Sequence, residues 1–353
     1  MALTLKGTTI FLALNLVLGL WASQAECRKP PEEASLRESH EQWMARHGRT
    51  YKDNAEKEQR LKIYKENLEY VKKFNSEGNQ TFKLSLNRFA DLTNEEFDYT
   101  RNGGLMVSSL SRPSRVNNSS IYDQTLFSSG GAPSSIDWRQ KGAVTNVRDQ
   151  GHSCGSCWAH ATVAAVEGLT KLKTGKLPLL SEQQLVDCII NNQNTRGCKG
   201  GSPVDAFGYI EQNGGITGEW NYPYVGKDGI CDQNRASQSA AKINGYALVP
   251  NNNEYALMNA VSKQPVAAFV SSRGKEVQFY SGGVFTGNCD PSTLDHVVAI
   301  VGYGTSKDGK KYWLIKNSWS SHWGENGYMR LERNSGIPEG RCGIAVDASY
   351  PTA

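Results

Sequence analysis

The feature that most constrains this chain is the run Gln150–Trp158, which places Cys157 in a segment of small and polar residues. His296 and Asn317 follow far downstream, each beside an apolar run. A thiol, an imidazole and a side-chain amide are the groups that a thiol nucleophile, its base and the partner that orients the base require. The sequence therefore predicts a fold that brings three distant segments together.

The spelling of this run, Cys-Gly-Ser-Cys-Trp, together with Leu-Asp-His and Lys-Asn-Ser-Trp downstream, resembles the papain-like cysteine proteases. The resemblance covers nearly the whole chain and is strongest to the plant senescence-associated vacuolar type. It implies an α+β fold of two lobes behind a helical propeptide. One lobe is mostly helical and carries Cys157, and the other is a β-barrel-like sheet that carries His296 and Asn317.

The cysteine count is compatible with this resemblance. Of eight cysteines, Cys27 lies near the N-terminus and seven follow residue 131, so full pairing of those seven leaves one thiol free. Spacing alone leaves fifteen pairings of six cysteines open. The resemblance implies three disulfides and a free Cys157; the pairs are Cys154 with Cys198, Cys188 with Cys231, and Cys289 with Cys342.

Cys154 and Cys157 also form a Cys-x-x-Cys pair, which is typical of a redox dithiol or of half a zinc site. A zinc site needs a second pair of ligands at similar spacing, and none follows. A redox dithiol needs a β-α-β setting, whereas this pair opens directly into an apolar helical segment. Both alternatives are therefore disfavoured, and we expect no metal and no organic cofactor.

The N-terminus predicts entry into the secretory pathway. Lys6, the apolar run 10–20 and the small residues before position 26 are typical of a cleaved signal peptide, residues 1–25. The alternative, a membrane anchor, needs about 20 apolar residues. We expect no membrane association after cleavage, and delivery to a vacuole or lysosome-like compartment or to the exterior. A net charge of +4 without long blocks of one sign does not indicate nucleic-acid binding.

Residues 26–131 resemble the inhibitory propeptide of the family. Apolar spacing predicts two amphipathic helices between residues 41 and 75. A helix stripe there matches the family's E-R-F-N-I-N pattern, although a surface stripe without special function would be equally periodic. Ser85 to Asp91 resembles a second family element, with Ser85 in place of glycine. The stripe consists of Glu56, Arg60, Tyr64, Asn67, Val71 and Asn75.

The segment 102–131 is rich in Ser, Gly and Asn and predicts a flexible linker that proteases can reach. Ala132-Pro133 resembles the start of mature family members, so residues 132–353 would form the peptidase domain. Three glycosylation sequons, at Asn79, Asn117 and Asn118, precede that point, and any glycan on them would leave with the propeptide.

The resemblance assigns roles to four residues. Cys157 would be the nucleophile, with its thiol pKa lowered by a helix N-terminus that Ser156 caps and by a neighbouring imidazolium. His296 would be the base and acid, although a lone histidine beside an apolar strand is more often a hydrogen-bonded core residue. Asn317 would orient the ring under the cover of Trp319, and the amide of Gln150 would help to form the oxyanion hole.

Three departures from the family pattern affect this assignment. Gln150 stands one residue further from the nucleophile than usual, because His152-Ser153 fills a one-residue gap. A misdirected amide would cost roughly 3 to 4 kcal/mol of barrier. His160 replaces a core aromatic; we expect a neutral, hydrogen-bonded ring, and the alternative is a second pH-sensing group. His322 replaces part of a glycine-rich triplet and is expected at the surface.

The substrate cleft can be predicted only by position. Gly201 would offer backbone hydrogen bonds to an extended peptide. The main side-chain pocket would be apolar, with Phe269 shortening it; Asp347 at its base leaves a basic preference as the alternative. The expected substrate-binding residues are Gly201, Ser202, Pro203, Phe269, Leu294, Asp295, Val297, Trp319 and Asp347.

These features predict a cysteine endopeptidase that is made as a secretory zymogen and cleaves peptide bonds by acyl transfer. Its expected partners are polypeptide substrates, its own propeptide and cystatin-like protein inhibitors, and it is expected to be a monomer. The alternative is a papain-fold binding or storage protein with weak or no turnover, because an altered oxyanion loop reduces catalysis without destroying the fold.

Overall fold

The computed structural model describes residues 31–102, 107–108, 131–189 and 195–353. The described residues form two compact units, which divide after Lys65. The signal segment with Cys27, and the sequons at Asn117 and Asn118, lie outside the described residues.

The first unit consists of α2 (Pro31–His47) and the first half of α3 (Asn54–Ser76). The start of α3 is capped in both directions, because the Glu56 N–H donates to Asp53 and the Lys52 N–H donates to the Glu56 carboxylate. Tyr64 is buried against the ring of Trp43 at 5.6 Å between centroids. The two predicted helices are present, and the first begins ten residues earlier than the apolar spacing suggested.

The second unit begins with the rest of α3, β1 (Phe82–Leu84) and α4 (Asn94–Asn102). Asn67 donates to the carbonyls of Ala90 and Leu92, and Asn75 exchanges two hydrogen bonds with Leu84. Two members of the predicted stripe therefore hold the segment that follows the helix, which a surface stripe without function would not do. A capping box between Thr93 and Glu96 starts α4.

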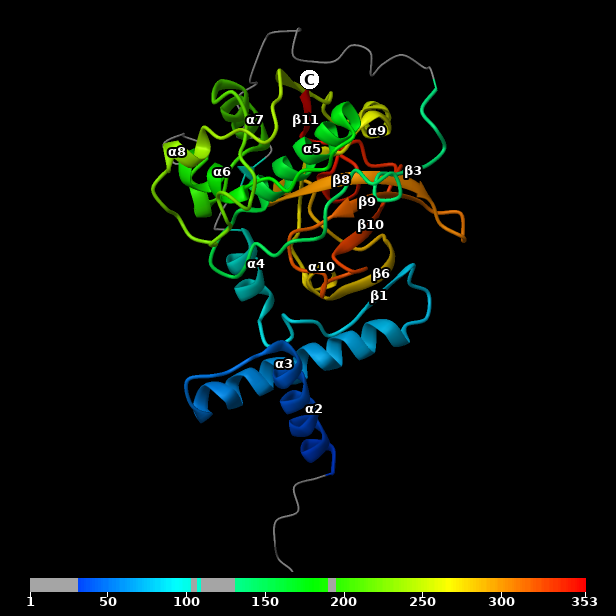
Figure 1. Ribbon diagram of the computed structural model, residues 1–353. Helices are drawn as coiled ribbons and strands as arrows, with labels where there is room; N and C mark the ends of the chain where they lie inside the picture. Colours follow the sequence, from blue (N-terminus) through cyan, green and yellow to red (C-terminus); the bar gives the residue numbers. More distant parts are fainter. Residues whose placement is uncertain (1–30, 103–106, 109–130, 190–194) are drawn as a thin grey trace, which may run out of the picture. The chain divides into compact units, whose positions relative to one another are not determined.

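A helical layer forms one side of residues 131–353 (Figure 1). Its central helix is α5 (Cys157–Thr174), which is buried along most of its length and ends at Gly175 in the left-handed conformation. Trp158, Leu185 and Phe207 are fully buried in the core around it. The other helices of this layer are α6 (Glu182–Cys188), the 3-10 turn η3 (Gly197–Lys199), α7 (Pro203–Gln212) and α8 (Gln233–Ala236).

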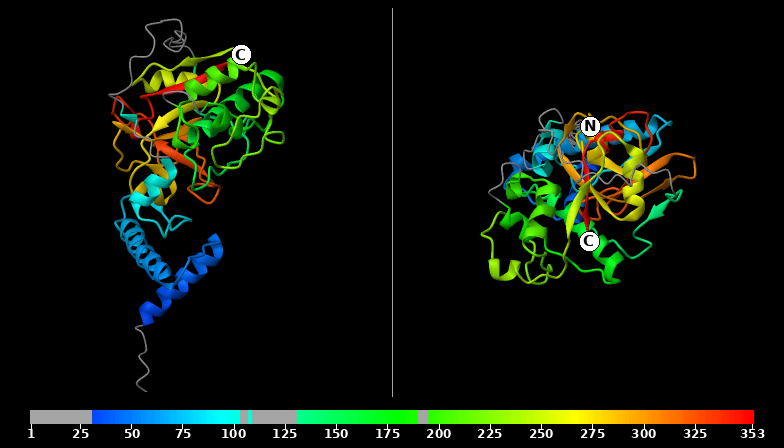
Figure 2. Two further views of the ribbon diagram at one scale, coloured as in Figure 1. Left: turned by 90° about the vertical axis from the view of Figure 1, so that its left-hand side faces the viewer. Right: turned by 90° about the horizontal axis from the view of Figure 1, so that it is seen from above.

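A nine-stranded mixed sheet forms the other side, in the order β1-β6-β10-β9-β8-β5-β11-β4, with β3 paired to β8. The β6–β10 pair is parallel, and the other pairs are antiparallel. Two views from other sides show the helical layer and the strands adjacent to each other (Figure 2). The strands are β3 (Ile136–Asp137), β4 (Gly245–Leu248), β5 (Val266–Val270), β6 (Tyr280–Phe285), β8 (His296–Thr305), β9 (Lys311–Lys316), β10 (Tyr328–Glu332) and β11 (Ala348–Thr352).

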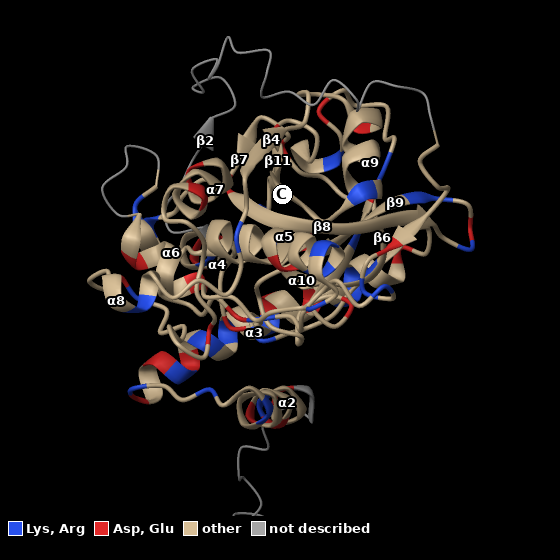
Figure 3. Ribbon diagram, turned by 45° about the horizontal axis from the view of Figure 1, so that its top comes forward, with Lys and Arg blue, Asp and Glu red and all other residues tan. Residues whose placement is uncertain are grey.

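Short elements complete the sheet side: α9 (Glu254–Lys263), α10 (Lys275–Phe279), the 3-10 turn η4 (Arg341–Gly343), and a two-stranded ribbon of β2 (Val107–Ser108) and β7 (Thr293–Leu294). Positions of basic and acidic residues are interspersed along the ribbon of the described helices (Figure 3).

Two details of the local structure concern the strand of His296 and the predicted linker. The strand β8 continues through Gly302 to Thr305. A Cβ on Gly302 would lie 2.2 Å from the carbonyl oxygen of Ile136 in the adjoining β3, so a residue without a side chain is required there. The predicted linker contains β2, which pairs antiparallel with β7, Val107 opposite Leu294. The other residues of that linker up to Gly130 lie outside the described part of the chain, apart from Asn102 at the end of α4.

Candidate functional site

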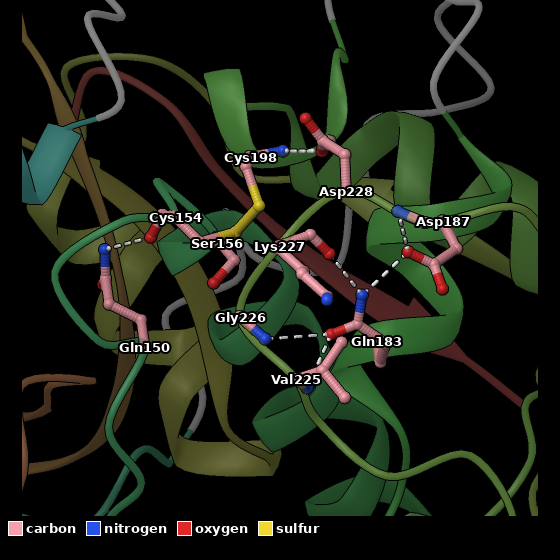
Figure 4. The surroundings of a disulfide bond; sticks show 12 residues. Gln150, Cys154, Ser156, Gln183, Asp187, Cys198, Val225, Gly226, Lys227 and Asp228 are labelled. Carbon is pink, nitrogen blue, oxygen red and sulfur yellow. Dashed lines mark hydrogen bonds between the residues drawn. A yellow bond between two sulfur atoms is a disulfide. The ribbon is translucent and has the colours of Figure 1, made fainter.

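Cys157 is the first residue of α5 and is buried, with 3% of its surface exposed. The backbone N–H of Val297, the residue after His296, lies close enough to favour the ionised form of its thiol, so the two distant segments meet. Among the described cysteines Cys157 is the free one, and the other six form the three disulfides that the resemblance implied. The disulfide between Cys154 and Cys198 lies next to the start of α5 (Figure 4).

Ser156 stands at the N-cap position of α5, but its side chain does not cap the helix, so that expectation was wrong. Its hydroxyl instead bonds the hydroxyl of Tyr224 at 2.6 Å. Tyr224 in turn donates to the carbonyl of Gln150 at 2.8 Å. The hydroxyl of Ser156 is therefore part of a connection that holds the loop before the helix.

His296 begins β8, and Asn317 directly follows β9. The Nε2 atom of His296 donates to the Oδ1 atom of Asn317 at 2.8 Å, and this oxygen also accepts from the backbone N–H of Ser318. Nδ1 of His296 is buried and has no hydrogen-bond partner among the described residues. The indole of Trp319 lies 4.6 Å from the imidazole, ring centroid to centroid, and is fully buried. Nδ1 is thus the ring nitrogen that is available for proton exchange.

Gln150 is fully buried, and its amide orientation is fixed at both ends. Ser318 Oγ donates to Oε1 at 2.7 Å, while Nε2 donates to the carbonyls of Cys154 at 3.2 Å and Arg101 at 2.8 Å. Figure 4 shows the bond to Cys154 across the loop. Gly151 adopts φ +81° in the loop that follows, and the amide directs its donors at backbone oxygens.

Propeptide residues cover this site within the second unit. Phe97 of α4 packs edge-on to Trp319 at 5.2 Å between ring centroids. Arg101, at the end of α4, is fully buried and places its carbonyl on the Gln150 amide. Sequence reasoning missed Arg101, because nothing in the local pattern distinguishes it from any other basic residue in the last turn of a helix.

The ionisation of the covered site differs from the expectation of a lowered thiol pKa. Burial raises the pKa of Cys157 to about 12 and lowers the pKa of His296 to about 4. The buried pair is therefore a neutral thiol and a neutral imidazole. The expected helix and imidazolium effects do not outweigh desolvation here, so the predicted lowering of the thiol pKa is wrong for this form.

His160 is neutral and hydrogen-bonded, as expected. Its Nδ1 donates to the carbonyl of Ser156 at 3.0 Å, and burial lowers its pKa to about 4. Its ring packs edge-on against Tyr224, with 5.0 Å between centroids. His322 is exposed, also as expected.

A group of buried charges behind the site was not predicted. Lys316, next to Asn317, donates to Thr145, which donates to Glu167 of α5, and Arg148 pairs with Glu182 at 3.4 Å. Burial raises the pKa of both carboxyls to about 7 and lowers the pKa of Lys316. A glutamate at position 167 inside an otherwise apolar helix was the signal that could have revealed this network.

The predicted substrate-binding residues divide into two groups. Leu294 is fully buried, with Phe269 and Val297 nearly so, while Ser202 and Asp347 are half-buried. Gly201 and Pro203 are buried, and a Cβ on Gly201 would lie 2.6 Å from the Trp158 ring. Asp295 does not present an open carboxylate, because it accepts from Ser272 and from Arg273 at 2.9 Å.

Within the described residues, no group of three or more His, Cys, Asp and Glu side chains is placed to bind a metal ion. No helix in the described ranges combines the length and apolar character needed to cross a membrane. Asn79 is exposed.

Residues 132–352 match the family model "Papain family cysteine protease", and residues 40–97 match "Cathepsin propeptide inhibitor domain (I29)". The chain belongs to the papain family of cysteine proteases. It is 46% identical over 351 residues to the senescence-specific cysteine protease SAG12 of Arabidopsis thaliana, covering 99% of this chain and 100% of that protein. It is also 46% identical to the senescence-specific cysteine protease SAG39 of Oryza sativa subsp. indica, covering 95% and 96%.

Two solved proforms resemble the structure. A recombinant stem bromelain precursor is 42% identical with a TM-score of 0.79, covering 90% of this chain and 99% of that one. The proform of a ragweed pollen allergen, the cysteine protease Amb a 11, is 39% identical with a TM-score of 0.82, covering 91% and 86%. This papain-family protein is therefore a cysteine endopeptidase with an inhibitory propeptide, and its relatives do not favour the binding or storage alternative.

Proposed function

We propose that peptide bonds are cleaved by Cys157 as nucleophile, His296 as base and acid, and Asn317 as the residue that orients the imidazole. The observation that carries this assignment is the fixed tautomer of His296: Nε2 is committed to Asn317, so Nδ1 faces the chemistry. A base whose second nitrogen is held by a carbonyl oxygen keeps the acceptor nitrogen directed at its target.

In the proposed reaction Nδ1 of His296 takes the thiol proton of Cys157, and the thiolate attacks the carbonyl carbon of the substrate. The resulting oxyanion accepts hydrogen bonds from the Gln150 amide and from the Cys157 backbone N–H. His296 then gives the proton to the leaving amine, and the carbon–nitrogen bond breaks. Water, deprotonated by the same nitrogen, attacks the thioester and releases the acid with the free thiol restored.

The propeptide carbonyl of Arg101 supports this oxyanion assignment. It accepts from Gln150 Nε2 at 2.8 Å, the distance at which an oxyanion donor acts. We infer that residues 26–131 hold the peptidase domain, residues 132–353, inactive by occupying this donor. Cleavage in the linker and release of α4 would expose Cys157, remove the desolvation that keeps the thiol neutral, and permit the thiolate–imidazolium pair.

The remaining functional details rest on sequence and resemblance. We propose an apolar preference in the main pocket, since Phe269, Leu294 and Val297 are apolar and belong to one buried cluster. We further propose a signal peptide at residues 1–25, vacuolar or extracellular delivery, and inhibition by cystatin-like proteins. A monomeric mature enzyme and glycans on the propeptide sequons complete the proposal.

The test is to acidify purified proprotein under mild reductant and titrate it with an epoxide thiol inhibitor. Hydrolysis of a dipeptide amide with an apolar second residue is followed in parallel. One inhibitor per chain on Cys157 with matching loss of hydrolysis is expected, and Cys157→Ser should abolish both. His296→Ala should abolish hydrolysis, whereas His322→Ala, which alters an exposed histidine, should retain it. Hydrolysis that survives His296→Ala would refute the assignment.

A further inference from the structure

The loop that contains the additional residue presents three hydrogen-bond acceptors in succession: the carboxylate of Asp149, the carbonyl of Gly151 and the ring of His152. Two propeptide arginines lie on them. Arg88 pairs with Asp149 and places Nη2 3.1 Å from Nε2 of His152. Arg101 donates from Nη1 to the Gly151 carbonyl at 2.7 Å and from Nη2 to Nδ1 of His152 at 2.6 Å.

The guanidinium of Arg101 is buried and does not lie at the surface of the protein. The residue is fully buried, and its guanidinium carbon lies 4.3 Å from the centroid of the Phe89 ring. Its own carbonyl accepts from the Gln150 amide, so backbone and side chain of one residue bind adjacent positions of the loop. Burying a guanidinium requires acceptors for its donors, and this loop supplies one to each of the two Nη atoms.

The ring of His152 must be neutral to accept. A neutral imidazole has one acceptor nitrogen, and the shorter contact assigns that role to Nδ1, facing Arg101. Nε2 then carries the hydrogen, and Arg88 is retained through Asp149. Both arginines can therefore be held at once only while His152 is uncharged.

We propose that Asp149, Gly151 and His152 form a guanidinium subsite beside the oxyanion amide, which the propeptide occupies with Arg88 and Arg101 and which selects arginine in peptide substrates once the propeptide has left. This inference rests on the proposed function of Gln150 and Cys157. All three acceptors belong to the peptidase domain and stay with the mature enzyme, whereas the Phe89 ring leaves with the propeptide.

The retained acceptors set the expected size of the preference. Hydrogen bonds to a charged group are stronger than those between neutral groups, but exposure to solvent and loss of the Phe89 face reduce their contribution. We expect arginine to be preferred over citrulline, its uncharged isostere, by about tenfold in kcat/KM at one position near the scissile bond.

The experiment uses enzyme processed from the full-length proprotein. One fluorogenic peptide is made with arginine placed in turn at each of the two positions on either side of the scissile bond, and each peptide has a citrulline counterpart. The wild-type enzyme should prefer arginine at one position. His152→Ala should reduce that preference to less than about threefold, while His322→Ala, the matched control, should retain it. Equal rates for arginine and citrulline at every position, or an unchanged preference in His152→Ala, would overturn the inference.

A dipeptide amide without arginine separates this result from the proposed function, because its hydrolysis depends on Cys157 and His296 and not on the subsite. A second readout needs no turnover. Cys157→Ser proprotein, cleaved in the linker by an added protease, is titrated with each peptide pair by calorimetry. Tighter binding of the arginine peptide supports the subsite even without hydrolysis, and equal affinities at every position contradict it.

Discussion

Replacing Gln150 with alanine tests whether the loop with the additional residue still supplies an oxyanion donor. The amide is fixed by Ser318 at Oε1 and donates to the Arg101 carbonyl in the zymogen, so we propose that the same donor faces the substrate carbonyl after release. Loss of one such donor costs roughly 3–4 kcal/mol of transition-state stabilisation. We expect kcat, measured per titrated thiol on an arginine-free dipeptide amide, to fall by about a hundred- to a thousand-fold.

The matched control is Gln183→Ala. Gln183 is also buried, and its amide donates to Asp187 at 2.7 Å and to the Lys227 carbonyl at 2.8 Å, in the same part of the helical layer (Figure 4). Both variants remove a buried amide, and both should lower the melting temperature. Only Gln150→Ala should lower kcat strongly, because Gln183 makes these bonds to structural groups. A kcat within about threefold of wild type for Gln150→Ala would refute the reasoning.

Three further variants test the buried charges. Lys316→Met leaves the Glu167 carboxylate without its compensating charge and should lower the free energy of unfolding in urea at pH 8 by roughly 3–5 kcal/mol. An unchanged unfolding midpoint would show that Lys316 does not compensate the charge of Glu167. Burial beside Asp295 raises the pKa of Asp98 to about 7, so docking of α4 is strongest in acid and weakens as pH rises through 7. Asp98→Asn removes this charge, so it should slow alkylation of the Cys157 thiol in the proprotein at pH 8. Equal alkylation rates for the variant and the wild type would exclude an effect of Asp98 on docking. Burial lowers the pKa of His160 to about 4, so the protein loses stability as the pH falls from 6.5 towards 4. His160→Phe removes this titrating group and should reduce the difference in melting temperature between pH 7 and pH 4.5. An unaltered difference would contradict this role of His160.

Residue type and spacing were sufficient to predict the local structure that forms within a single segment of the chain. The step-of-four stripe predicted α3, and its members Asn67 and Asn75 hold the following segment by side-chain bonds to the backbone. The apolar run after His296 predicted a strand, and resemblance to the family placed Asn317 beside the imidazole.

The features that were missed depend on tertiary proximity. The Gln150–Arg101 hydrogen bond joins segments on opposite sides of the linker, and no periodicity encodes it. Ser156 could cap a helix by type, but Tyr224, far along the chain, takes its hydroxyl. The thiol pKa was predicted from the helix end and the imidazole alone, whereas the burial that raises the pKa is a property of the folded zymogen.

The central claim is that the site is assembled in the zymogen and kept neutral by burial until the propeptide leaves. It is tested most directly by the rate at which iodoacetamide alkylates Cys157 between pH 4 and pH 9, in the proprotein and in the mature enzyme processed from it. We expect rapid alkylation of the mature enzyme already at pH 5–6, and alkylation of the proprotein at least about a hundredfold slower at the same pH. A proprotein thiol that reacts as fast as the mature one, or a mature thiol that reacts only above pH 8, would contradict the account.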